Sequence, residues 1–218
     1  MHTDNVRLLL DGRWSLEELA ATGRAYNQVY SFAYTLLPDL AQARLSEVRY
    51  VYANLPWRGG YSTVNFFFNI FKKIPHEAQP QIKQIKYASP GFIELAEILA
   101  VAIVVSRFVK TVCSMLIVAN DTYRHIQKGV IEHQLNKATA NLKELELAER
   151  QRTFCERSSK QLSEVLGMTD EEQSTLDTRV NGNQLMKLKL LLSVFRRVEP
   201  LAVKQKEGKL DVTDKKVE

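Results

Sequence analysis

Polar and apolar positions alternate along the first 90 residues in patterns that predict both strands and helices. Short stretches with strand-like alternation or composition lie at 5–10, 46–55 and 82–88. Apolar residues recur at helical spacing over 15–37, where Ser15 and Glu18 match a capping box and Pro38 ends the pattern. Residues 62–73 fit either period, and we favour a helix there. The pattern therefore predicts an N-terminal part that mixes strands and helices.

The longest hydrophobic feature follows the sequence Ser89-Pro90-Gly91. Ser89 suits a helix N-cap and Pro90 suits the first helical turn, so we expect a helix to begin at residue 90. Helical projection gathers the polar residues of this segment in one stripe: Arg107, Lys110, Ser114, Asp121, His125, Lys128 and Glu132. The rest of the circumference is apolar to about residue 120, and a weaker coiled-coil spacing continues to 145. One long central helix is the resulting prediction.

This helix raises the question of a membrane. A spanning helix needs about 20 consecutive apolar residues, whereas charged residues interrupt 92–119 at Glu94, Glu97, Arg107 and Lys110. We therefore expect it to be buried or to pair with a copy of itself. The expected interface residues are Ile98, Val101, Val104, Phe108, Met115, Ile126, Val130, Leu135, Leu142 and Leu145. The alternative is a membrane-active effector that inserts this helix into an anionic inner membrane.

The C-terminal part predicts further helices and a hairpin. Thr169 with Glu172 forms a second capping box, and Asn183 suits the N-cap of the next helix. Alternation over 199–213 predicts a β-hairpin that packs back on the N-terminal part. The expected fold class is α+β, with a small mixed sheet, packed helices and the long central helix. Its expected divisions are 1–90, 91–167, 168–213 and a tail at 214–218.

The charge balance permits an anionic partner. The chain is 45% hydrophobic and 25% charged, with a net charge of +5, which is ordinary for a globular protein with a slight basic excess. If the hairpin pairs with the strand at 82–88, a basic patch forms from Lys83, Lys86, Lys187, Lys189, Arg196, Arg197, Lys204, Lys206 and Lys209. Such a patch would favour nucleic acid, although no recognised nucleic-acid-binding motif accompanies it. A nucleic-acid-binding module is therefore a further alternative.

Motifs of catalysis and metal binding are not evident. Cys113 and His125 would lie about 18 Å apart on one helix, and no HExxH, GxSxG or GxGxxG sequence occurs. The sequence thus favours a protein that is not an enzyme and predicts no metal or cofactor. With two distant cysteines and no signal-peptide pattern, we expect a cytoplasmic protein. The candidate ligand or anion residues are Trp57, Arg58, Gly59, Gly60, Ser89 and Gly91.

The order of strand, Ser-Pro-Gly, apolar helix and charged helix resembles that of a group of uncharacterised bacterial proteins. Tyr87, Ser89, Pro90, Gly91 and the aliphatic run after them carry this resemblance, which covers about the middle third of the chain. It implies a bacterial accessory protein of a defence or stress operon, without catalytic residues. We therefore expect a non-enzymatic protein that forms a homo-oligomer or binds a partner encoded in its operon.

Overall fold

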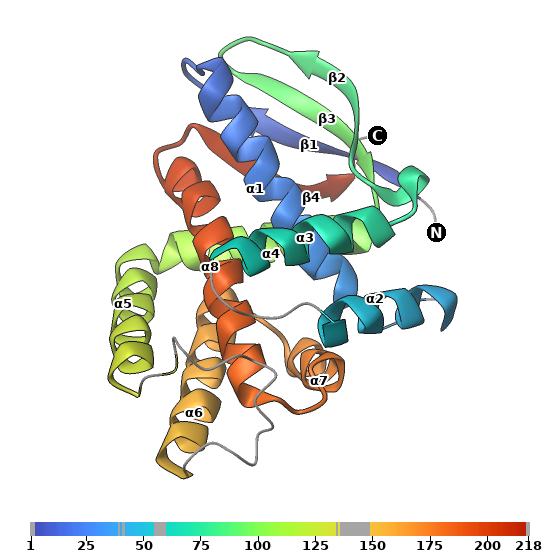
Figure 1. The fold of residues 1–218 in the computed structure, drawn as a ribbon. Helices are drawn as coiled ribbons and strands as arrows, with labels where there is room; N and C mark the ends of the chain where they lie inside the picture. Colours follow the sequence, from blue (N-terminus) through green and yellow to red (C-terminus); the bar gives the residue numbers. More distant parts are fainter. Residues whose placement is uncertain are drawn as a thin grey trace.

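Four strands form a single sheet in the computed structural model, which describes residues 3–38, 40, 42–54, 60–133, 135 and 149–216. The strands are β1 (Asp4–Leu10), β2 (Gln81–Lys86), β3 (Gly91–Glu97) and β4 (Leu210–Lys216). They lie in the order β2-β3-β1-β4, and every neighbouring pair is antiparallel (Figure 1). The expected sheet of N-terminal, central and C-terminal strands is confirmed, but it is antiparallel throughout and not mixed.

The two faces of the sheet differ in polarity. Val6, Leu8 and Leu10 of β1 are buried toward the helices. On the opposite face, Arg7 forms an ion pair with Glu94 at 2.8 Å. A period of two on neighbouring strands places the apolar side chains on one face, which is how the sheet buries its share of the core.

Helices account for most of the remaining described chain. They are α1 (Leu16–Thr35), α2 (Gln42–Asn54), α3 (Gly60–Lys73), α4 (Leu99–Ser114), α5 (Leu116–Glu132), α6 (Glu149–Leu166), α7 (Asp170–Arg179) and α8 (Gln184–Lys206), with a 3-10 turn, η1, at His76–Ala78. α8 packs against α1, α4 and α6, and α5–α7 lie at the end away from the sheet (Figure 1). The predicted α+β class is therefore confirmed.

Three helix starts lie where local signals predicted them. Ser15 and Thr169 each form both hydrogen bonds of a capping box, with Glu18 and Glu172 respectively. Asn183 accepts a hydrogen bond from the backbone N–H of Met186 at the start of α8. The predicted helix at 62–73 is also present, as α3.

The prediction of one long helix from residue 90 to 145 is wrong. Residues 91–97 form β3, and the chain then bends by 93° between α4 and α5. Ser89 and Pro90 lie in the turn between β2 and β3, where a Cβ on Gly91 would lie 2.4 Å from the carbonyl oxygen of Lys86. β3 has a strand on each side, and its outer face is partly buried. Its side chains therefore do not show the simple alternation of apolar and polar residues by which a strand is recognised in a sequence.

Two smaller expectations are also wrong. Residues 46–55 were predicted as a strand, but residues 46–54 belong to α2, which buries Val48, Val51 and Tyr52 at helical spacing. The predicted hairpin at 199–213 is absent because α8 continues through Pro200 to Lys206. Only its second strand exists, as β4, and it pairs with β1. The coiled-coil seam at 135–145 lies mostly outside the described residues.

Every helix in the described ranges is too short or too polar to cross a membrane by itself. α4 and α5 reach the required length and hydrophobicity only when taken together across their 93° bend. α4 buries Val101, Val105 and Phe108 within the fold.

Candidate functional site: the outer face of α5

The position of α5 is fixed by its contacts with α6 and α8. Ala119, Ile126 and Val130 are buried on its inner side. Gly129 allows the close approach of α6, since a Cβ there would lie 2.4 Å from a ring carbon of Phe154. These contacts decide which side of α5 remains outside.

A second set of contacts holds the middle of α5 against α8. The Tyr123 ring stacks on Phe195 with 4.8 Å between ring centroids. The Gln127 side chain donates a hydrogen bond to the Tyr123 hydroxyl at 2.6 Å, and Arg196 also contacts that hydroxyl. α5 therefore presents one defined face to solvent.

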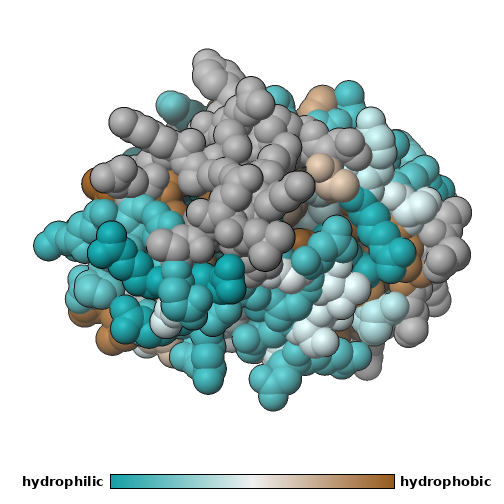
Figure 2. All heavy atoms as spheres, turned by 60° about the horizontal axis from the view of Figure 1, so that its bottom comes forward, coloured by the Kyte–Doolittle hydropathy of each residue, from teal (hydrophilic) through white to brown (hydrophobic). Residues whose placement is uncertain are grey.

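The outer face of α5 carries large aliphatic side chains that have no cover. Ile117 is 79% exposed, Val118 61% and Ile131 63%. Ile117 and Ile131 are 14 residues apart, close to four turns of about 3.6 residues, so they lie on the same side of the helix. Figure 2, which brings the lower end of Figure 1 forward, shows a mainly hydrophilic surface outside the grey residues, with small hydrophobic areas at its left and right margins.

Charged residues lie between these aliphatic side chains. Asp121 faces Arg124 at 3.9 Å, and Lys128 faces Glu132 at 3.8 Å. These are loose, exposed pairs within one helix, each contributing about 0–1 kcal/mol. The polar stripe predicted from the sequence is confirmed on α5, where Asp121, His125, Lys128 and Glu132 are exposed.

Most residues expected in an oligomer interface lie inside the chain's own core. The buried ones are Ile98, Val101, Phe108, Ile126, Val130 and Leu135. Val104 is partly buried, Met115 is 36% exposed, and Leu142 and Leu145 lie outside the described residues. Their helical spacing indicated burial correctly but not the surface they bury against. The sequence interpretation missed Ile117, Val118 and Ile131, whose exposure depends on the bend before α5.

Only part of the expected ligand site lies in the described part of the chain. Trp57, Arg58 and Gly59 lie outside the described residues, and Gly60 is the first residue of α3. Ser89 hydrogen-bonds the carboxylate of Asp11 and accepts the backbone N–H of Gly12 at 3.3 Å. The pKa of Asp11 lies below its ordinary value, chiefly because of the Ser89 hydroxyl. A carboxylate beside Ser89 and Gly91 opposes anion binding in that turn.

The expected basic patch is not assembled either. Lys83 and Lys86 lie on β2, which is separated from β4 by β3 and β1. Several of the other cations are engaged elsewhere: Lys187 with Asp177 at 2.7 Å, Lys204 and Lys209 with Glu18 at 3.5 and 3.0 Å, Arg196 with Tyr123, and Arg197 over the Phe67 ring at 4.1 Å. Lys189 is half-buried, and burial lowers its pKa. The premise that a C-terminal hairpin joins β2 is therefore wrong.

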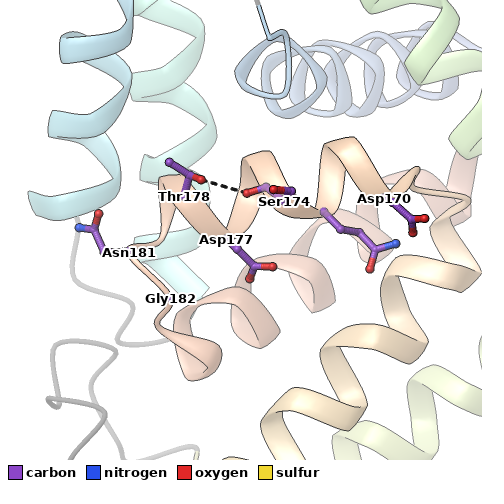
Figure 3. A pocket seen from close by; sticks show the side chains of 7 residues that line it. Asp170, Ser174, Asp177, Thr178, Asn181 and Gly182 are labelled. Atoms are coloured by element: carbon purple, nitrogen blue, oxygen red, sulfur yellow. Dashed lines mark hydrogen bonds between the residues drawn. The ribbon is translucent and has the colours of Figure 1, made fainter.

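A polar hollow of about 610 Å³ runs along α7. Asp177 within it accepts two hydrogen bonds from Lys187, at 2.7 and 2.8 Å. Figure 3 shows the labelled side chains spread along the helix and its C-terminal end without converging on one point, and Thr178 donates to the carbonyl of Ser174 at 3.1 Å. Within the described ranges, no three His, Cys, Asp or Glu side chains are grouped to hold a metal.

Glu97 is the described carboxyl group with the most unusual surroundings. It is fully buried at the end of β3, and its Oε1 accepts the Tyr26 hydroxyl at 2.7 Å. Burial raises the pKa of Glu97 to about 8, and the hydrogen bond from Tyr26 opposes part of that rise. It does not line the hollow on α7.

Comparisons with protein-family models, curated proteins and solved structures give no match to this chain.

Proposed function

We propose that the protein is non-enzymatic and self-associates through the outer face of α5. The observation that carries the proposal is the exposure of Ile117, Val118 and Ile131 on one helix that packs against α6 and α8. Exposed aliphatic side chains of this size, near both ends of one helix and with charged residues between them, can supply the apolar contacts of an interaction surface. Fully burying each one contributes about 1.5–3 kcal/mol.

We favour a second copy as the partner because an antiparallel pairing would place unlike charges of the two copies opposite each other at two symmetric positions. In an antiparallel pair centred near Arg124, Asp121 of one copy lies opposite Lys128 of the other. The aliphatic residues at the two ends of the helix then also lie opposite each other. In a dimer with two-fold symmetry each copy contributes the same surface, which is the arrangement of most soluble dimers.

The test is light scattering coupled to size-exclusion chromatography over a concentration series. We expect the wild-type protein to dimerise at micromolar concentrations and Ile117→Glu to shift it to monomer. Leu16→Glu is the matched control, since Leu16 is 83% exposed on α1 and should not affect association. A monomer at several hundred micromolar, or equal effects of both variants, would refute the proposal.

Charge exchange tests the antiparallel orientation. Asp121→Lys alone should weaken dimerisation because it places like charges opposite Lys128. Combining it with Lys128→Asp should restore most of the affinity, since opposite charges face each other again. If the double variant is no better than the single one, the helices do not pair in this orientation.

The sequence-based alternatives have less support. The apolar side chains of α4 pack inside the fold, and the basic residues are spread over opposite sheet edges and ion pairs. An accessory role in a defence or stress operon, with an operon-encoded partner, remains a prediction of the sequence resemblance.

A further inference from the structure

A groove of about 650 Å³ lies between α1 and α3, away from α5. α3 crosses α1 in Figure 1, and the groove follows α1 over residues 20–31, about 16 Å of helix. Its apolar wall is formed by Phe67, Phe68 and Phe71 of α3. Such a volume, bounded by aromatic side chains with a few polar groups, is in the range of small-molecule sites, about 300–1,000 Å³.

Gly23 lies in the opposite wall, beside open space. The glycines at 12, 167, 182 and 208 have a positive φ, and those at 91 and 129 have an atom 2.4 Å from where a Cβ would be. Gly23 has no positive φ and no close neighbour that would require a glycine, since nothing lies within 4 Å of its Cβ position. Glycine inside a helix costs about 0.5–1 kcal/mol relative to alanine. The chain therefore has a helix-weakening residue in the wall of the groove, at a position where a side chain would extend into open space.

The charges around the groove favour an anion. Arg24 contributes to the lining, and the Lys72 ammonium lies 4.1 Å from the centroid of the Phe68 ring. None of the described residues that line the groove is acidic. Asn27 and Asn65 add side-chain amides, which donate hydrogen bonds to anionic oxygens. Phe68 is 55% exposed and offers its ring to an apolar body.

We propose that this groove binds a small anionic amphiphile. Its aromatic or aliphatic body lies on Phe68 and Phe71 beside Gly23, and its carboxylate, sulfonate or phosphate group lies between Arg24 and Lys72. This activity goes beyond self-association, because it uses different helices from the α5 face.

The experiment uses two probes on the full chain: 8-anilinonaphthalene-1-sulfonate, followed by fluorescence, and dodecanoate as competitor. We expect one sulfonate bound per chain and displacement by dodecanoate. Gly23→Leu, which fills the groove, should weaken probe binding at least tenfold. Gly23→Ala is the matched control and should change binding less than threefold, and Arg24→Gln should weaken it severalfold and reduce its salt dependence.

Several outcomes would overturn the proposal. Failure of either probe to bind at millimolar concentration would do so, as would unchanged binding to Gly23→Leu. If Gly23→Leu does not fold, Phe68→Ala replaces it, because Phe68 is half exposed and its loss should weaken binding about tenfold. If a second copy occupies the groove instead, Gly23→Leu would abolish the dimer seen by light scattering, which also refutes a small-molecule site.

Discussion

Replacing Glu97 with glutamine should change how the stability of the protein depends on pH. The carboxyl group is fully buried, and one of its oxygens accepts the Tyr26 hydroxyl at 2.7 Å. Its other oxygen accepts no hydrogen bond from a described residue. Burial without full hydrogen bonding disfavours the charged form, which is why the pKa is raised to about 8.

The sign and size of the effect follow from proton linkage. In the unfolded chain the Glu97 pKa is the ordinary value, about 4.3. Between this value and about 8, the unfolded chain has lost the proton while the folded protein keeps it. The free energy of unfolding therefore falls as pH rises, by about 1.4 kcal/mol per pH unit. The contribution of the protonated group is fully present below pH 4 and is lost as pH rises through the folded pKa.

Urea unfolding of wild type and Glu97→Gln from pH 5 to 8 measures this contribution. The amide keeps an acceptor for Tyr26 but does not ionise, so the difference in unfolding free energy should move in favour of the variant by about 3–4 kcal/mol across that window. Glu156→Gln, at an exposed position on α6, is the control and should show no such trend. A difference between Glu97→Gln and wild type that stays constant with pH would refute the reasoning.

Two further substitutions test the packing that holds α5 and α7. Gly129→Ala should lower the free energy of unfolding by about 1–3 kcal/mol in urea denaturation, because the added methyl group would overlap the Phe154 ring. Arg107→Ala should lower it by about 2–4 kcal/mol in calorimetry. It removes a hydrogen bond of 2.6 Å to the Gly167 carbonyl and leaves buried Glu172 without its cation.

Matched controls exist for both substitutions. Gly23→Ala adds the same methyl group in open space and should stabilise the protein by up to about 1 kcal/mol. Arg44→Ala breaks a half-exposed ion pair with Glu47 on α2, away from the α5 face, and should change stability by less than about 1 kcal/mol. If Gly129→Ala is as stable as Gly23→Ala, α5 and α6 are not in close contact. If Arg107→Ala behaves like Arg44→Ala, the Arg107–Glu172 pair does not hold α7.

Most features that depend on a few neighbouring residues were predictable from the sequence, although the helix cap expected at Ser89 is a turn between β2 and β3. The caps at Ser15, Thr169 and Asn183 need only the next turn of the helix, and all three are present. β3 was not predictable in the same way, because its apolar sequence also fits a helix. Its strand conformation depends on pairing with β1 and β2, which are distant in the sequence or separated from it by a turn. The bend before α5 involves no proline or glycine, since Met115 is the residue at the break. The direction of α5 after the bend goes with its tertiary contacts to α6 and α8, which local sequence does not reveal.

The candidate sites show the same difference between features set by local sequence and features set by tertiary contacts. Helical periodicity predicted that Val101, Phe108 and Ile126 are buried, and they are. It did not predict that Ile117 remains outside, because that depends on the direction of α5 after the bend. Gly23 looks unremarkable in the sequence and becomes informative only when the space beside it is known.

The pairing of β1 with β4 also has a consequence for synthesis on the ribosome. Leu8 pairs with Val212, so β1 waits for a partner made about 200 residues later, or about 10–40 s at 5–20 residues per second. During that interval the backbone N–H and C=O groups along one edge of β1 have no strand to pair with. A nascent chain of this protein would therefore benefit from a chaperone until α8 and β4 emerge, and fusions that delay release of β4 should lower the soluble yield.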